Sequence, residues 1–110
     1  MESKIKEFIK KLGISPELIG YDYMVSTLAE MCAKDTTSKA GYTKLYSQIG
    51  EIYGVAGASI ERMINVAIKR VFENPESLEI ARRELKFPFF NDKCTTSQFL
   101  ALCAEKLMEE

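Results

Sequence analysis

The stretch EIYGVAGASIERMIN, residues 51–65, places Gly54 and Gly57 between two segments of helical periodicity. A glycine in a helix interior costs about 1 kcal/mol relative to alanine, so two of them would weaken one continuous helix. A corner between two helices, in contrast, favours glycine at the exit from the first helix. The stretch therefore indicates either a defect in one long helix or a turn between two helices.

The residues around Gly54 favour the turn and match the spacing of a helix-turn-helix motif. Gly50, four residues earlier, lets the backbone of a second helix approach closely, and a positive φ at Gly54 lets the chain leave the first helix. Val55 is apolar and is expected to plug the corner. The other apolar positions of the pattern are Ile49, Tyr53, Ile60 and either Met63 or Ile64. A second helix over about residues 58–73 is predicted to follow.

The rest of the chain also shows helical periodicity, and apolar residues nowhere alternate with polar ones over the length of a strand. We therefore expect about six helices and no strand. The predicted fold is all-α: a compact six-helix domain that contains the helix-turn-helix and spans residues 1–110 as a single domain.

Local signals predict two helix starts in addition to the corner. Ser15 and Pro16 suit the first positions of a helix that continues to about Ala33, and Gly20 is a candidate for dividing it into a short turn and a longer helix. Pro75 is expected to end one helix and begin the next.

Two further expectations concern the C-terminal third of the chain. Phe87, Phe89 and Phe90 lie in an aromatic loop and are expected to fold back onto the core. Thr95 and Gln98 have the spacing of a capping box, in which each side chain bonds the backbone of the other residue. The box predicts the start of the last helix.

The composition fits a folded globule and gives little support to catalysis. The chain of 110 residues is 46% hydrophobic and 28% charged, with a net charge of −1, which neither favours nor excludes nucleic acid as a partner. The lack of histidine removes the commonest general base and metal ligand. No nucleophile–base pair and no phosphate-binding loop is recognisable, so we expect neither an enzyme nor a cofactor.

The cysteines and the N-terminus indicate the expected compartment. Cys32, Cys94 and Cys103 are widely spaced, odd in number and form no C-x-x-C motif. This spacing disfavours a disulfide framework or a zinc site and favours a reducing cytoplasm. The N-terminus lacks the apolar core of a signal peptide, and no run approaches the ~18 apolar residues of a membrane span. A cytoplasmic protein with no membrane partner is predicted.

The helix-turn-helix motif predicts double-stranded DNA as the partner, because its second helix lies in the major groove with its first residues near the base edges. The outward positions at the start of this helix are Ala56, Gly57, Ala58, Ser59, Glu61, Arg62 and Asn65. Arg62 suits a guanine edge, Glu61 suits cytosine, and Asn65 suits adenine or a phosphate. Ser59 and the N–H groups at the helix start suit a phosphate.

Basic residues around the motif are candidates for contacts with the flanking DNA backbone. They are Lys39, Lys44, Lys69 and Arg70. Together with Arg62 they outnumber Glu51 and Glu61 and leave a local charge of +3 between residues 39 and 72. A tight corner between helices is also a common structural device, and exposed cations also serve as solvated surface residues.

Four segments resemble the C-terminal effector domain of the sporulation initiation response regulator, the stage-zero master regulator of endospore-forming bacteria. These segments are LGISPELIGYDYMVSTLAEMC, KLYSQIGEIYG, SIERMINVAIKRVF and TTSQFLALCAEKL. The resemblance spans roughly residues 12–107 with compatible spacing throughout. It implies a six-helix DNA-binding domain that regulates transcription at the onset of sporulation.

The resemblance also implies partners. The family reads an operator box of the TGTCGAA type, often in tandem copies bound by two protomers, which implies self-association on tandem sites. Contact with an RNA polymerase sigma subunit is implied as well. In the whole family protein, an N-terminal receiver domain controls the effector domain through aspartate phosphorylation.

Transferred position by position, the resemblance assigns base contacts to two residues. Glu61 and Arg62 match the Glu-Arg pair with which the family's recognition helix contacts bases. Ser59 and Asn65 each lie where the family has an arginine, and Val66 lies where it has a histidine. The loss of cationic contacts predicts a weaker or altered operator preference and a flatter salt dependence.

Two further departures precede the turn, where Ser47 and Gln48 replace the family's proline and aspartate. Gln48 is included among the candidate DNA-binding residues. The leading hypothesis is a sequence-specific DNA-binding transcription regulator. The alternative is a protein–protein interaction module of the same fold with reduced or lost DNA binding, which the missing arginines and the small residues VAGAS motivate.

Overall fold

The computed structural model describes residues 1–34, 41–86 and 94–109. These residues form six helices, α1 Glu2–Lys11, α2 Ile19–Ala33, α3 Tyr42–Tyr53, α4 Gly57–Glu73, α5 Pro75–Leu85 and α6 Thr96–Glu109. No strand occurs in this described part of the chain. The prediction of an all-α fold with six helices is confirmed.

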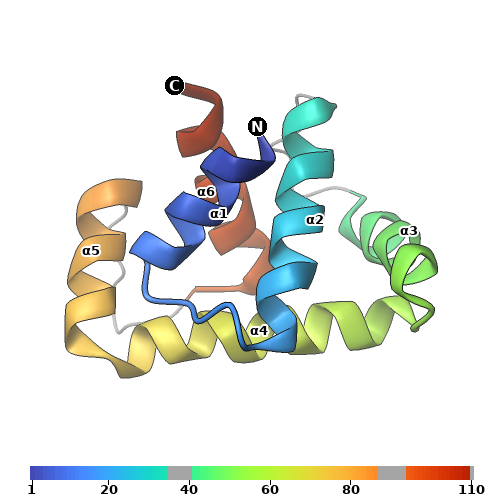
Figure 1. Cartoon of the computed structure of the whole chain (residues 1–110), viewed down its shortest axis with the longest axis horizontal. Coiled ribbons are helices and arrows are strands. Elements are labelled where there is room, and N and C mark those ends of the chain that lie inside the picture. Colours follow the sequence, from blue (N-terminus) through green and yellow to red (C-terminus); the bar gives the residue numbers. More distant parts are fainter. Residues whose placement is uncertain (35–40, 87–93, 110) are drawn as a thin grey trace.

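The helix α4 is the longest of the described elements and forms the base on which most of the others pack (Figure 1). It contacts α2, α3, α5 and α6, whereas α1 packs against α2. Figure 1 shows α3 at one end of α4 and α5 at the other, with both chain termini on the side of the molecule away from α4. The outer side of α4 is thereby kept away from the ends of the chain.

The hydrophobic core receives side chains from all six helices. Fully buried examples are Ile5 of α1, Leu28 of α2, Ile64 of α4 and Phe99 of α6; Ile49 of α3 and Leu85 of α5 are nearly so. Removing such side chains from water is the main driving force for folding, at about 25 cal/mol per Å² of apolar surface. The apolar stripes that predicted these helices are the surfaces on which they meet.

The start of α2 differs from the prediction. Ser15 and Pro16 do not begin the helix; the Leu18 amide donates to the Ser15 carbonyl oxygen at 3.1 Å in a turn, and α2 begins at Ile19. The predicted short turn followed by a longer helix is present, but the division lies before Ile19, and Gly20 is inside the first turn of α2. It is a close-packing position, because a Cβ there would overlap the carbonyl oxygen of Met63 in α4.

Both predicted signals for the later helices are confirmed. Pro75 is the first residue of α5, and the Asn74 side chain accepts hydrogen bonds from the amides of Glu76 at 3.0 Å and Ser77 at 3.2 Å. The capping box before α6 is complete. The Thr95 amide donates to Gln98 Oε1 at 2.9 Å, and the Gln98 amide donates to Thr95 Oγ1 at 3.1 Å.

Some predictions fall outside the described residues, namely those for Lys39 and for the aromatic loop of Phe87, Phe89 and Phe90. The three cysteines all lie in the described residues and form no disulfide bond, and Cys103 is buried. None of the helices in residues 1–34, 41–86 and 94–109 is long and apolar enough to span a membrane.

Candidate DNA-binding surface

The stretch around Gly54 forms a corner between two helices and not a defect in one. Gly54 has φ of 72° and ends α3, and α4 begins three residues later at Gly57. The amides of Gly54 and Val55 both donate to the Gly50 carbonyl oxygen, the latter at 2.9 Å. These bonds satisfy a carbonyl that the helix end would leave without a partner.

Two more glycines let the backbones approach closely at this corner. A Cβ on Gly50 would overlap the Val55 carbonyl oxygen and lie 3.3 Å from the Ala56 carbonyl carbon. A Cβ on Gly57 would lie 2.9 Å from the Ser47 amide nitrogen of α3. The prediction that Gly57 is an outward position facing DNA is therefore wrong, since its side-chain position faces α3.

The apolar residues of the corner divide into two groups. Ile49, Ile60 and Ile64 are buried and hold α3 and α4 together, as the motif predicts. Val55 does not plug the corner, because 37% of its surface is exposed. Met63, the other candidate for an inward position, is only half-buried.

Tyr53 connects the corner to α2 instead of filling the core. It remains 40% exposed, and its ring packs against Tyr23 with centroids 4.8 Å apart. Its hydroxyl lies 2.6 Å from Ser26 Oγ, within hydrogen-bonding distance. These contacts join the end of α3 to α2.

The outer face of α4 carries most of the predicted site residues in one stripe. The exposed members of this stripe are Ala58, Glu61, Arg62, Asn65 and Lys69. Their spacing of three or four residues puts them on the same side of the helix. Ser59 is half-buried beside the stripe, and Arg70 is exposed one position beyond Lys69.

The two candidates on α3 lie apart from this stripe. Lys44 is exposed and Gln48 is half-buried, one turn apart on the helix that precedes the corner. In a helix-turn-helix motif, the first helix crosses the DNA backbone while the second enters the major groove of the DNA. The positions of Lys44 and Gln48 on the first helix suit phosphate contacts more than base contacts.

A groove runs along each side of the α4 stripe. The groove toward α3 is lined by Thr43, Tyr46, Ser47, Gly57, Ala58 and Glu61. The groove toward α6 is lined by Ala58, Glu61, Arg62, Asn65, Thr95, Thr96 and Ser97. Ala58 and Glu61 line both grooves, so the start of α4 is a ridge between them.

Tyr46, which lines the groove toward α3, has a buried hydroxyl group. Tyr46 is buried, and within the described residues its hydroxyl has no hydrogen-bond partner. Burial raises the pKa of Tyr46 well above its usual value, and the Glu61 carboxylate raises it further. Tyr46 is therefore a neutral hydrogen-bond donor near the base of the α4 stripe.

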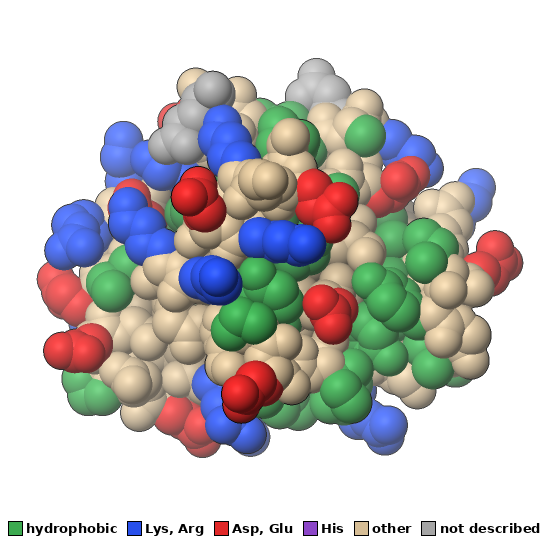
Figure 2. All heavy atoms as spheres, in the orientation of Figure 1, with side chains coloured by type: hydrophobic (Ala, Val, Ile, Leu, Met, Phe, Trp, Pro, Cys, Tyr) green, Lys and Arg blue, Asp and Glu red, His purple; other side chains and the backbone are tan. Residues whose placement is uncertain are grey.

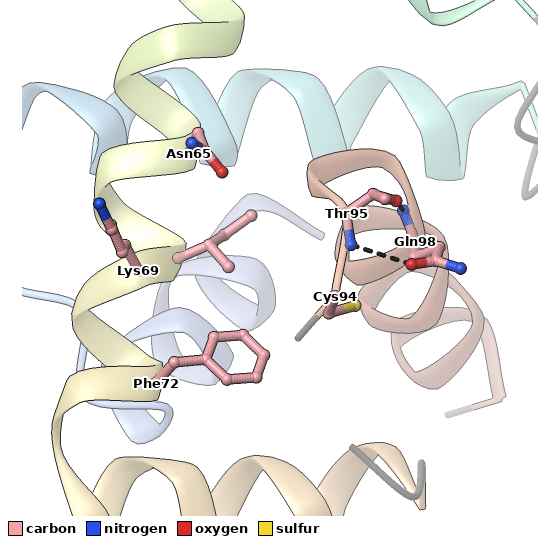
Figure 3. Close-up of a pocket in the computed structure, with 7 residues that line it drawn as sticks. Asn65, Lys69, Phe72, Cys94, Thr95 and Gln98 are labelled. Carbon is pink, nitrogen blue, oxygen red and sulfur yellow. Dashed lines mark hydrogen bonds between the residues drawn. The ribbon is translucent and has the colours of Figure 1, made fainter. Parts of the chain in front are cut away.

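The start of α6 was not predicted as part of this surface. The Thr96 hydroxyl donates to Asn65 Oδ1 at 3.0 Å, across a sequence separation of 31 residues. Figure 3 shows an adjoining pocket, with Asn65, Lys69 and Phe72 on the α4 side. Cys94, Thr95 and Gln98 line its other side at the start of α6. No local sequence signal connects the two segments, because only packing brings them together.

Comparison with known proteins gives a family for the chain. Residues 5–107 match the family described as "Sporulation initiation factor Spo0A C terminal". No curated protein sequence matches the chain. The family consists of DNA-binding regulatory domains and is not a family of enzymes. Since the match extends into all six helices, the chain belongs to the family of the C-terminal domain of the sporulation initiation factor Spo0A.

Proposed function

We propose that this chain is a sequence-specific transcription regulator in which α4 is the recognition helix and lies in the major groove of DNA. The observation that carries the proposal is the exposed polar stripe on α4, held at a fixed angle by the glycine corner with α3. A helix fits the major groove, and side chains near its N-terminus reach the base edges.

Within this proposal the polar residues of the stripe have separate tasks. Arg62 donates to a guanine edge, and Glu61 accepts from the amino group of a cytosine. Ser59 and the backbone amides of Gly57 and Ala58 at the start of α4 hold a phosphate. Lys69, together with Lys44 and Gln48 on α3, contacts the flanking backbone; such contacts set affinity and register but carry no sequence information.

The experiment that tests the proposal is selection of bound duplexes from a random pool at low salt. We expect one short box to be enriched, and we expect its affinity to fall steeply as salt concentration rises, because bound cations displace counterions. Enrichment of two copies at a fixed spacing would support self-association on tandem sites. Recovery of random sequences, or of no duplex, would contradict the assignment of α4 as a recognition helix.

A second candidate function rests on exposed apolar side chains near the corner. Ile52 is 70% exposed, and Tyr53 and Val55 are also exposed. Figure 2 shows one face of the molecule, and apolar side chains gather at its right side, over α2 and α3. Over the rest of this face, acidic and basic side chains are interspersed. Exposed apolar patches mark protein interaction sites, so this surface favours a protein–protein interaction module of the same fold.

The two functions differ in what a purified mixture would show. A regulator with an interaction surface binds its box and recruits an RNA polymerase sigma subunit to it. An interaction module binds the sigma subunit without any shift of DNA. Titration of the chain against a labelled duplex and against a labelled sigma subunit, each alone, separates them.

A further inference from the structure

Asn65 lies on the exposed stripe of α4, but one of its two hydrogen-bonding groups is already engaged. Its Oδ1 accepts a hydrogen bond from the Thr96 hydroxyl at 3.0 Å. A side-chain amide has one carbonyl oxygen and one NH₂ group, so this bond leaves the NH₂ group to face outward. The side chain as a whole remains exposed, and Asn65 lines both the groove toward α6 and the adjoining pocket of Figure 3.

The electrostatics of α6 favour this orientation of the amide. Thr96 is the first residue of α6, where aligned peptide dipoles and unpaired N–H groups create a partial positive charge. A carbonyl oxygen is attracted to this helix end, whereas an NH₂ group is repelled by it. The capping box of Thr95 and Gln98 fixes the start of α6, and therefore the position of the Thr96 hydroxyl.

The orientation decides which base edge Asn65 is able to read. An asparagine that reads adenine uses both groups, with Oδ1 accepting from N6 and the NH₂ group donating to N7. Because Oδ1 is turned toward Thr96 and one of its two lone pairs is occupied there, the NH₂ donors are the groups that Asn65 presents to the groove. Guanine presents two acceptors there, O6 and N7, and no donor.

We propose that Thr96 is a positioning residue that makes Asn65 a donor-only reader, so that the base pair facing Asn65 is selected for guanine over adenine. The inference rests on the proposed function, in that α4 must lie in the major groove. It differs from the adenine or phosphate contact that the sequence predicts for Asn65. It also gives α6 a part in specificity without requiring that α6 contact a base.

The test compares the boxes that four proteins select from a random duplex pool. The first step compares the box selected by Asn65→Ala with that of the unaltered protein. The position at which Asn65→Ala loses its base preference is the base pair that Asn65 contacts. Thr96→Val removes the hydroxyl at nearly constant volume, and Thr96→Ser keeps it as the matched control. We expect the unaltered protein and Thr96→Ser to prefer guanine at that position, and Thr96→Val to change the guanine-to-adenine ratio by about tenfold toward adenine.

A second measurement needs no variant and so does not depend on folding of Thr96→Val. We replace guanine by 7-deazaguanine at the identified position, which removes the N7 acceptor. The unaltered protein is expected to bind this duplex about fivefold or more weakly.

Three outcomes would overturn the inference while leaving the proposed function intact. They are selection of adenine by the unaltered protein, an identical box for a folded Thr96→Val, and an Asn65→Ala variant that weakens binding to all boxes equally, as a phosphate contact would. Selection of no box by the unaltered protein, in contrast, would contradict the proposed function itself.

Discussion

Gly50 of α3 lies directly against the carbonyl group of Val55, so that a Cβ atom on Gly50 would overlap the carbonyl oxygen. Gly54, at the same corner, has open space around its side-chain position but a φ of 72°. The two glycines are therefore needed for different reasons. Gly50 provides room between backbones, whereas Gly54 provides a conformation that L-residues disfavour.

Replacing these two glycines separately should show the difference. Gly50→Ala is expected to lower the free energy of unfolding by about 2–3 kcal/mol, because backbone atoms must move to admit the methyl group. Gly54→Ala is expected to cost only about 1 kcal/mol, for the positive φ alone. Urea unfolding followed by circular dichroism measures both. Equal costs, or a smaller cost for Gly50→Ala, would contradict the close approach at the corner.

Thr27 of α2 should limit stability. It is fully buried, and its hydroxyl has no hydrogen-bond partner among the described residues. Thr27→Val keeps the shape and removes the unpaired hydroxyl, so the free energy of unfolding should rise by about 1 kcal/mol. Thr43→Val, at an exposed position of α3, is the control and should change stability by less than about 0.5 kcal/mol. A loss of stability in Thr27→Val would show that the hydroxyl has a partner in solution.

Glu84 should make stability depend on pH. It joins three helices, since its carboxylate pairs with Lys11 of α1 and lies 3.9 Å from Lys106 of α6. The hydrogen bond from Lys11 and the nearby lysine charges lower the pKa of Glu84 below its ordinary value of 4.5. A carboxylate whose pKa is lower in the folded state stabilises the fold above its ordinary pKa, and this contribution is lost as the pH falls through the folded-state value.

Removing the Glu84 charge should therefore have a larger effect on stability at neutral pH than at acidic pH. Glu84→Gln should be less stable than the unaltered protein at pH 7, and the difference should shrink as the pH is lowered below 4.5, the ordinary value for this group. Chemical unfolding of both proteins between pH 7 and a pH below 4.5 measures this difference in the free energy of unfolding. Glu79→Gln removes an exposed carboxylate from the same helix and is the control. If Glu84→Gln and the unaltered protein differed by the same free energy of unfolding at pH 7 and below pH 4.5, the pairing of Glu84 with the two lysines would not be the source of the difference.

Arg62 and Lys69 should affect DNA binding in different ways. Arg62→Ala is expected to weaken binding to the selected box by about 1–3 kcal/mol and to relax preference at one base pair. Lys69→Ala is expected to weaken binding to all sequences alike and to reduce the salt slope by about one unit. Fluorescence anisotropy at several salt concentrations measures both effects.

Arg83→Ala is the matched control for these two variants. It removes the same charge from an exposed position on α5, away from the α4 stripe. Its binding to the selected box should stay close to that of the unaltered protein. If Arg62→Ala behaves like Arg83→Ala, Arg62 does not read a base and the recognition surface lies elsewhere.

The helices and the corner were predictable because their signals are local. The periodicity of Ile60 and Ile64 follows from the helical repeat, and the glycine at position 54 follows from the φ that a helix exit requires. The start of α2 was predicted too early because Ser15 and Pro16 satisfy the local rules for a helix start and for a turn equally well. Local rules do not decide between a helix start and a turn when tertiary packing sets the residue at which the helix begins.

The sequence by itself determined six helices, a glycine corner between the third and fourth, and a polar stripe on the fourth, because each depends on residues within a few turns of one another. The tertiary structure decided which surfaces those glycines meet: Gly20 lies against Met63 and Gly57 against Ser47. It also brought Thr96 to Asn65 across 31 residues. Such contacts depend on how whole helices pack, and this packing cannot be predicted directly from the spacing of residues along the chain.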